Sequence, residues 1–330
     1  MQAVYDFGIV FVLFVQSLGD WLAAPMLFFS SLGRENFFLL LVPVIYWLMD
    51  ARFAVRLGLM LMFSIALHEG LKLLFHTPRP YWLDGRVLAL DTEISFGMPS
   101  GHAQDAVLVW GLIASQLRRR WAWLAAGALA FLIGSSRIYL GVHFPWDTLL
   151  GWTLGGVLLW AVLRFEQPLL AWLRRFSLPA RIALASAFSL LLILLLVMAK
   201  TSLQTWQTPS AWLENAAAAG QALTVEETRA LSVAVAGVGT FLGIAVGVIW
   251  LHGRGGFDPR GDWKQLAGRL LIGMTGMALL FLLREIFPSG ESALAMILRF
   301  ARYTLMGAWA GGLAPWLFCR LKLAESIKRV

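Results

Sequence analysis

Residues 97–120 read GMPSGHAQDAVLVWGLIASQLRRR, and this stretch decides the fold. A polar segment ending at His102 leads into an apolar run that extends to Leu117, and three arginines stop the run. Apolar side chains suit the interior of a lipid bilayer, whereas clusters of arginine mark its aqueous boundary. The pattern predicts a membrane-spanning helix over residues 102–117 with a polar motif at one end.

The composition extends this interpretation to the whole chain. Of the 330 residues, 59% are hydrophobic and 14% are charged, whereas a soluble domain carries roughly 25% charged residues. We therefore predict an all-α polytopic membrane protein, a helical bundle with about nine transmembrane helices, counted as apolar runs of ~20 residues. The expected spans are residues 37–48, 53–75, 102–117, 121–140, 144–163, 182–199, 231–251, 266–287 and 293–317.

The chain divides into four predicted parts. Residues 1–34 contain an apolar run, Phe7 to Val15, that is too short to cross a membrane, which favours interfacial or re-entrant helices. Residues 35–165 form a transmembrane core that holds the polar motifs. Residues 166–181 are rich in arginine and proline and predict a basic cytoplasmic connector. Residues 182–330 add further C-terminal transmembrane helices, whose role stays open.

The distribution of basic residues predicts the orientation in the membrane. The formal net charge is +8, but Lys and Arg lie in short clusters between apolar runs, which argues against nucleic acid as a partner. Segments rich in Lys and Arg remain in the cytoplasm. In this chain they are residues 50–56, 118–120, 164–181, 252–269 and 320–329. The polar clusters then share the opposite, extracytoplasmic face.

The first polar cluster holds Lys72 and Arg79. The lysine ends an apolar run, and the arginine lies in the following loop between Pro78 and Pro80, which stiffen the backbone. A guanidinium fork matches the oxygens of a phosphate group, and the ammonium adds a compact positive charge. Alternatively, Lys72 only reaches the lipid headgroups from a helix end, as basic residues near a membrane boundary do.

The second cluster, Pro99-Ser100-Gly101-His102, is expected to begin a helix. Ser100 is a candidate N-cap residue, and Gly101 lets the backbone approach a ligand closely. The free amide groups of a helix N-terminus attract anions, and His102 would lie in the first turn beside a bound phosphate. By itself, the motif is equally explained by a helix start with an interfacial histidine.

The third cluster runs from Ser136-Arg137 to His143 and Asp147. An aspartate four residues after a histidine can accept its Nδ1 proton and leave Nε2 free to act as a nucleophile. This spacing also occurs among metal ligands. However, no further carboxylate cluster lies nearby, and Cys319 is the sole cysteine, so we expect neither a metal nor an intrachain disulfide.

Together, the motifs Lys-x6-Arg-Pro, Pro-Ser-Gly-His and Ser-Arg-x5-His-x3-Asp resemble those of the type 2 phosphatidic acid phosphatase superfamily of integral membrane lipid phosphatases. The resemblance covers residues 35–165 and implies that they form a catalytic phosphatase core. It implies that His143 is the nucleophile, that Asp147 orients it and that His102 is the general acid. It also implies a metal-independent reaction without a cofactor. The residues that it assigns to phosphate binding are Lys72, Arg79, Ser100, Gly101 and Arg137.

The expected reaction is hydrolysis of a lipid phosphate or pyrophosphate at the outer face of the membrane through a phosphohistidine. The extracytoplasmic placement makes undecaprenyl pyrophosphate an attractive substrate, in the inner membrane of a bacterium with the site facing the periplasm or exterior. Three alternatives stay open. The chain could be a phosphatase of a soluble phosphomonoester, resembling glucose-6-phosphatase, a lipid phosphotransferase, or a non-catalytic lipid-binding or transport protein.

A few further residues carry weaker expectations. Glu69 is expected to pair with Lys72 three residues later on a helix, whereas Asp91 and Glu93 are expected in a solvated loop. Four glycines lie partly on one stripe of a predicted helix and would permit close helix packing, which leaves a homo-oligomer open. They are Gly237, Gly239, Gly243 and Gly247.

Overall fold

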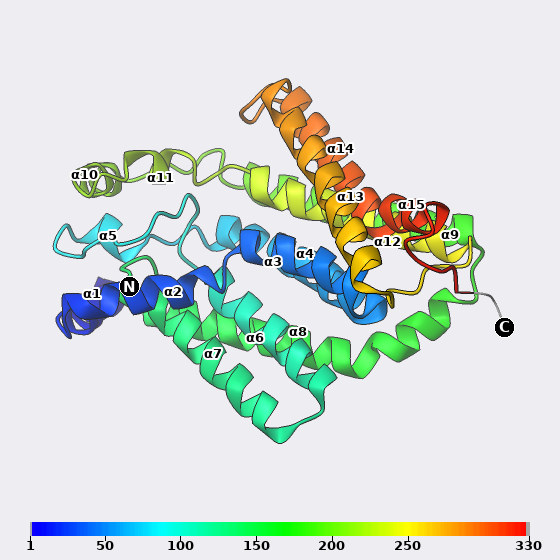
Figure 1. Ribbon diagram of the computed structural model, residues 1–330. Helices are drawn as coiled ribbons and strands as arrows, with labels where there is room; N and C mark the ends of the chain where they lie inside the picture. The colour runs from blue at the N-terminus through cyan, green and yellow to red at the C-terminus, as the bar shows by residue number, and fades with distance from the viewer. Residues whose placement is uncertain (1, 328–330) are drawn as a thin grey trace. The chain divides into compact units, whose positions relative to one another are not determined.

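The computed structural model describes residues 2–327, and helices dominate them. Within these residues no strand forms, and one isolated bridge joins Asp258 to Glu325. The predicted all-α architecture is confirmed. The helices drawn in Figure 1 are α1 (Gln2–Gln16), α2 (Ala23–Ser31), α3 (Glu35–Leu48), α4 (Ala51–Phe75), α5 (Pro80–Leu83), α6 (Gly101–Leu117), α7 (Arg120–Tyr139), α8 (Pro145–Leu173), α9 (Leu178–Thr201), α10 (Ser210–Ala218), α11 (Ala222–Glu226), α12 (Ser232–His252), α13 (Trp263–Leu282), α14 (Ala293–Ala308) and α15 (Ala314–Arg320).

Six helical segments in the described part are long and apolar enough to cross a membrane. A seventh would arise if α1 and the segment Asp20–Ser31, which meet at a bend of 86°, formed one broken span. The expected count of nine spans and the N-terminal interfacial helix therefore stay predictions. The six segments are Ala51–Leu83, Arg120–Tyr139, Pro145–Leu173, Leu178–Thr201, Ser232–His252 and Trp263–Glu285.

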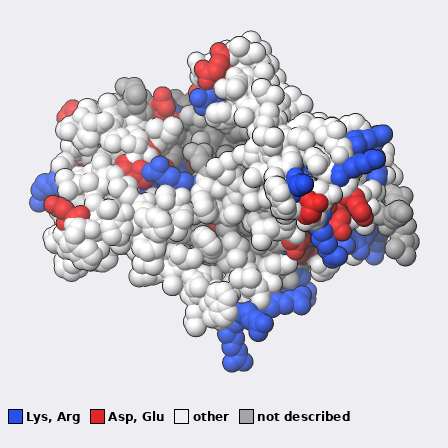
Figure 2. Space-filling model, viewed as in Figure 1, with Lys and Arg blue, Asp and Glu red and all other residues white. Residues whose placement is uncertain are grey.

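The surface of these helices suits lipid rather than water. On the face shown in Figure 2, charged side chains gather in separate clusters with broad uncharged areas between them. Large apolar side chains are exposed along α9 and α13, among them Leu190, Leu194, Leu271 and Leu279. Contiguous apolar surface of this kind is unfavourable in water and is tolerated where the solvent is hydrocarbon.

The chain forms two compact units, each built from separate stretches of sequence. Unit 1 comprises residues 1–37, 67–163 and 197–230, and it contains all three polar motifs. Unit 2 comprises the remaining residues, 38–66, 164–196 and 231–330. The division predicted along the chain, with boundaries after residues 34, 165 and 181, stays a prediction.

Unit 1 brings the beginnings of α6 and α8 together next to α7. The backbone N–H of Ser100 donates to the carbonyl of Asp147 over 3.0 Å, which joins the two helix starts. Farther along, the Trp152 indole of α8 donates to the carbonyl of Ala130 in α7 over 3.0 Å. The second and third motifs, which lie at these helix ends, are thereby fixed next to each other.

The segment 197–230 returns to unit 1 and packs beside α5. The rings of Trp82 and Trp212 lie 5.7 Å apart, and Asn215 donates to the carbonyl of Trp82 over 3.0 Å. Trp206 contacts the Phe96 ring with a centroid distance of 5.7 Å. This aromatic packing supports the loop that carries Ser95 and Phe96 into the site described below.

Unit 2 is held by the close packing of α12 against α14. A Cβ added to Gly243 would lie 2.1 Å from the carbonyl oxygen of Thr304, so only glycine permits this approach. Gly239 and Gly247 of the same stripe also face α14 and the π-helical turn that follows it. The stripe is therefore used for packing within the chain, and the homo-oligomer stays a prediction.

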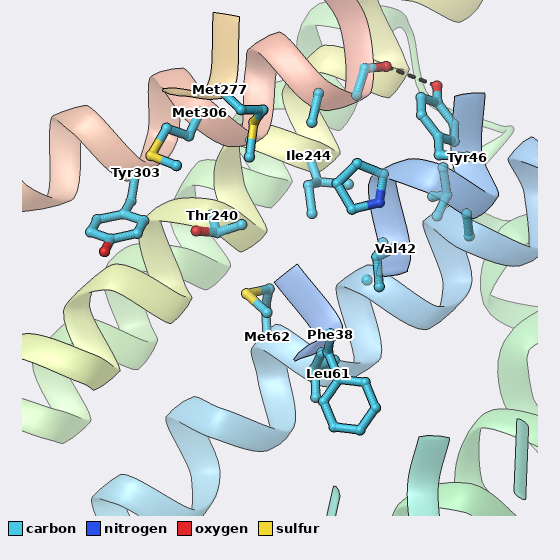
Figure 3. A pocket seen from close by; sticks show the side chains of 17 residues that line it. Phe38, Val42, Tyr46, Leu61, Met62, Thr240, Ile244, Met277, Tyr303 and Met306 are labelled. Carbon is cyan, nitrogen blue, oxygen red and sulfur yellow. Dashed lines mark hydrogen bonds between the residues drawn. The ribbon is translucent and has the colours of Figure 1, made fainter. Parts of the chain in front are cut away.

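The π-helical turn Trp309–Leu313 interrupts the last predicted span. A π-turn disturbs the regular hydrogen-bond ladder of a helix. Side chains of α3 bond to two of its carbonyls, with Tyr46 Oη donating to Gly311 over 2.9 Å and Trp47 Nε1 to Ala310 over 3.0 Å. Figure 3 shows the Tyr46 bond at the edge of an apolar pocket.

Arg269 of α13 stabilises unit 2 through backbone carbonyls. Its side chain is fully buried although it lies within an apolar helix. The guanidinium donates to the carbonyls of Leu323 (2.7 Å), Trp47 (3.2 Å), Arg260 (2.7 Å) and Pro259. It therefore fastens the end of α3, the loop before α13 and the C-terminal tail to one another.

Replacing Arg269 by methionine is expected to destabilise the protein by about 3 kcal/mol, because several buried carbonyls lose a charged donor at once. The measurement is thermal unfolding in detergent. Arg260→Met is the matched control, since that side chain is 91% exposed and surface substitutions usually change stability by less than about 0.5 kcal/mol. Equal melting temperatures for the two variants would show that Arg269 does not hold the unit together.

Candidate active site

The two cations of the first motif converge on one serine. Lys72 Nζ donates to Ser95 Oγ over 3.0 Å, and Arg79 Nη2 donates to the same oxygen over 3.1 Å. Lys72 is 6% exposed and pairs with Glu69 over 2.6 Å, which confirms the expected contact between these residues. Because Lys72 is buried and paired, the alternative in which it reaches out to lipid headgroups is wrong.

Arg79 links the loop after α5 to the loop before α8. Besides Ser95 Oγ, it donates from Nε to the Ser95 carbonyl (2.7 Å), from Nη2 to the Phe96 carbonyl (3.1 Å) and from Nη1 to the Val142 carbonyl (2.7 Å). Nη1 also lies 3.5 Å from His143 Nε2. The arginine is fully buried, so a cation is held beside one nitrogen of His143.

The other ring nitrogen of His143 faces Asp147. The distance from Nδ1 to Asp147 Oδ2 is 3.4 Å, and the same oxygen accepts the Phe144 N–H over 2.8 Å. Burial, and next the charge of Arg79, holds the pKa of His143 well below its usual range. This environment favours the neutral imidazole, with Nδ1 toward the carboxyl group of Asp147 and Nε2 toward Arg79.

The second motif begins α6 as expected. Ser100 occupies the N-cap position, but its hydroxyl makes no cap bond, and within the described residues the buried Oγ has no hydrogen-bond partner. A Cβ added to Gly101 would lie 2.7 Å from Cε1 of the buried His68 ring. His68 therefore fills the space behind Gly101, and the hydroxyl and the helix amides are left for an anion.

Replacing Gly101 by alanine is expected to lower phosphatase turnover at least ~10-fold, because the added methyl group displaces the start of α6 and a small misplacement of reacting groups is costly. The measurement is kcat in detergent. Gly127→Ala in α7 is the matched control, since no atom lies within 4 Å of its added Cβ, and it is expected to keep wild-type turnover. Unchanged turnover in Gly101→Ala would show that the site tolerates the shift.

Two carboxylates bind the arginine of the third motif. Arg137 is fully buried. Its Nη1 donates to Asp91 Oδ2 over 2.6 Å and its Nη2 donates to Glu93. Asp91 also accepts from Arg34 over 2.7 Å. Burial opposes the ionisation of the Asp91 and Glu93 carboxyl groups. The charge of Arg137 outweighs this effect and holds the pKa of each group at about 2.

The expectation of a solvated loop at Asp91 and Glu93 is wrong. Their side chains are 8% and 21% exposed and serve as the counter-charges of a buried guanidinium. Glu93 also lies near the second histidine, with Oε1 at 3.8 Å from His102 Nδ1. The sequence offered one signal for the pairing of Arg137 with Asp91 and Glu93: an arginine in an apolar helix needs an anionic partner if it is buried.

The geometry supports phosphoryl transfer. A neutral histidine, a carboxylate behind it and buried cations in front of it are the groups required for nucleophilic attack on a phosphate. The assigned roles of the predicted residues, and the expectation of neither metal nor cofactor, stay predictions. Ser95 accepts from both Lys72 and Arg79. His143 lies between Arg79 and Asp147, and the backbone N–H of Ser100 donates to the backbone carbonyl of Asp147. Glu93 lies between Arg137 and His102.

Comparison with known proteins identifies the family. Residues 53–171 match the PAP2 superfamily, and residues 235–326 match the transmembrane extension of PAP2 superfamily phosphatases. The chain is 32% identical over 163 residues to phosphatidylglycerophosphatase B of Bacillus subtilis, a match that covers 44% of this chain and 76% of that protein.

Two further similarities are found. Undecaprenyl-diphosphatase of Sulfolobus acidocaldarius is 31% identical over 136 residues, which are 39% of this chain and 64% of that protein. The crystal structure of the first transmembrane PAP2 type phosphatidylglycerolphosphate phosphatase from Bacillus subtilis covers 51% of this chain and 88% of its own, with 27% identity and a TM-score of 0.45. The chain therefore belongs to the PAP2 superfamily and is an integral membrane phosphatase.

Proposed function

We propose that the chain hydrolyses a lipid phosphate or diphosphate at the outer face of the membrane through a phosphohistidine on His143. The observation that carries the proposal is the environment of this residue, with Asp147 at 3.4 Å from Nδ1 and Arg79 at 3.5 Å from Nε2. The carboxylate fixes the tautomer that leaves a lone pair on Nε2, and the guanidinium draws a phosphate to that nitrogen.

In the first step, the Nε2 lone pair of His143 attacks phosphorus. The bond from phosphorus to the lipid oxygen breaks, its electron pair moves to that oxygen, and the oxygen takes a proton from His102. Lys72, Arg79 and Arg137 offset the charge on the phosphoryl oxygens, and a preorganised set of buried cations is effective at this task. Asp147 offsets the positive charge that His143 gains when it is phosphorylated.

In the second step, water attacks the phosphohistidine. His102, which lost its proton in the first step, accepts one from the water as the oxygen bonds to phosphorus. The bond between phosphorus and Nε2 breaks, and its electrons return to His143 as the lone pair. Inorganic phosphate leaves and both histidines regain their initial protonation.

A lipid substrate is favoured because the polar motifs lie at the ends of apolar helices, level with headgroups. The named relatives that act on phosphatidylglycerophosphate and on undecaprenyl diphosphate support the same class. The excess of Lys and Arg in the opposite loops supports an extracytoplasmic site, in the inner membrane of a bacterium. Undecaprenyl diphosphate is the preferred candidate, since a carrier lipid released outside the cell must be dephosphorylated there.

The test is phosphate release by the purified protein in detergent, with EDTA present, across lipid monophosphates, lipid diphosphates and soluble phosphomonoesters. We expect release from a lipid class at least ~10-fold faster than from the soluble esters, because binding energy from the lipid tail lowers the barrier. Faster release from a soluble ester would overturn the substrate class. Adding a membrane-impermeant short-chain lipid phosphate to intact cells then tests the orientation, which is wrong if only lysed cells release phosphate.

A further inference from the structure

Glu93 contacts both the phosphate-binding arginine and the second histidine of the site. Its carboxylate accepts from Arg137 Nη2, and Oε1 lies 3.8 Å from His102 Nδ1. The opposite ring nitrogen, His102 Nε2, is buried and has no hydrogen-bond partner within residues 2–327. One nitrogen of His102 therefore faces a carboxylate while the other is free for a ligand. In His143, likewise, one ring nitrogen faces a carboxyl group, that of Asp147.

Asp91, the other carboxylate on Arg137, is held differently. It accepts from Arg137, from Arg34 over 2.7 Å and from the Thr92 backbone N–H over 2.9 Å. Ser30 Oγ also donates to Asp91 Oδ2, over 3.4 Å. Four donors therefore anchor Asp91 in place, whereas Glu93 has a longer side chain and a single guanidinium donor in the described part of the chain. Of the two, Glu93 is the carboxylate that can change partners when a phosphate competes for Arg137.

We propose that Glu93 is a positioning residue for His102: substrate phosphate displaces it from Arg137 Nη2, and its carboxylate then binds His102 Nδ1–H. The inference rests on the proposed function. A movement of about 1 Å would shorten the 3.8 Å separation to hydrogen-bond length. Burial, Arg137 and Lys72 disfavour a positive charge on His102, whereas Glu93 and Asp91 favour it. The Glu93 carboxylate beside Nδ1 is therefore needed to keep this general acid protonated.

The proton balance follows from this arrangement. In the empty site, Glu93 neutralises Arg137. Once phosphate has replaced Glu93 on Arg137, Glu93 neutralises the His102 imidazolium, which forms as His102 takes up a proton from the solvent. The Nε2 proton of His102 goes to the leaving oxygen as the bond to phosphorus breaks. The Nδ1 proton remains on His102 and stays hydrogen-bonded to the Glu93 carboxylate. Water returns a proton to Nε2 in the second step. Substrate binding and the charging of the acid are thereby coupled through one carboxylate.

The test compares two leaving groups. An alkyl lipid phosphate needs a proton on its leaving oxygen, whereas p-nitrophenyl phosphate releases a stable anion without one. Glu93→Gln is expected to lower kcat at least ~10-fold more on the lipid phosphate than on the aryl phosphate, since general acids contribute 10²–10⁴-fold. The alkaline limb of the lipid pH–rate profile is expected to move to lower pH, because the variant loses the charge that keeps His102 protonated.

Two variants serve as controls. Asp91→Asn removes a carboxylate that binds Arg137 and influences His102 only through its charge, so it is expected to show a smaller difference between the two substrates than Glu93→Gln. Glu93→Asp keeps the charge and is expected to show the leaving-group preference more weakly than Glu93→Gln. It also provides a result if the glutamine variant fails to fold, as judged by size-exclusion chromatography.

The outcomes separate the two claims. Equal losses on both substrates in Glu93→Gln, or no loss on either, overturn the inference while the phosphatase mechanism stands. His143→Ala runs alongside, and turnover of both substrates by that variant would overturn the proposed function itself. A selective loss on the lipid phosphate, with His143→Ala inactive, supports both.

Discussion

Replacing His143 by alanine is expected to lower phosphate release by a factor of at least ~10⁴, because the variant has no atom that can form the covalent intermediate. The loss should appear in kcat for every substrate, whatever its leaving group, since each turnover passes through the same phosphohistidine. Steady-state phosphate release in detergent measures it.

The control for this variant is His252→Ala. His252 ends α12, is exposed and lies in unit 2, so its replacement is expected to leave turnover unchanged. Both proteins should elute from size-exclusion chromatography as wild type does, which separates lost chemistry from lost folding. Substantial turnover by a folded His143→Ala protein would mean that another group, or water itself, attacks phosphorus.

Replacing Asp147 by asparagine is expected to lower kcat about 10³–10⁴-fold while KM changes little, because the amide cannot hold the proton on His143 Nδ1 and the productive tautomer is lost. Asp147 is fully buried and accepts the Phe144 N–H over 2.8 Å. The substitution therefore preserves shape but not charge. The measurement is the separation of kcat from KM on a lipid phosphate.

Asp84→Asn is the matched control for this substitution. Asp84 lies in the loop after α5 and pairs with exposed Arg86 over 2.6 Å, away from His143. We expect less than about a 2-fold change in kcat, since exposed ion pairs contribute 0–1 kcal/mol. If Asp147→Asn behaved like Asp84→Asn, the carboxylate would have no part in orienting the nucleophile.

The local parts of the site were predictable because each depends on short sequence spacing. Lys72 and Glu69 share one helix face, Ser100 precedes an apolar run, and Asp147 follows His143 by four residues. Such contacts follow from helix geometry alone. Membrane proteins also confine charge to helix ends, which places these motifs near one another before any tertiary contact is known.

The contacts that were missed join distant parts of the chain. Glu93 and Arg137 are 44 residues apart, in a loop without periodicity that predicted solvent exposure. Ser95 receives both cations of the first motif, yet nothing in its sequence context distinguishes it. Arg269 falls in the segment 252–269, which was predicted as a basic cytoplasmic segment, because hydropathy cannot show that a guanidinium inside an apolar helix meets carbonyls from elsewhere.

The helix interruptions were also beyond sequence reasoning. Residues 293–317 were predicted as one span, but a π-turn at Trp309–Leu313 separates α14 from α15. Its alanines and glycines are apolar, so the hydropathy pattern continues through it. The turn forms where α12 approaches through glycines and where Tyr46 and Trp47 bond to its carbonyls. Tertiary packing therefore overrides a continuous apolar pattern.

The covalent intermediate itself offers the most direct test of the mechanism. Wild-type protein is mixed with lipid phosphate, stopped in alkali, where phosphohistidine persists, and digested for mass spectrometry. The account predicts one added phosphoryl group on the peptide that contains His143, formed within a turnover and absent from His143→Ala. Turnover without phosphate on His143, or phosphate on His102 instead, would contradict the assignment of the nucleophile.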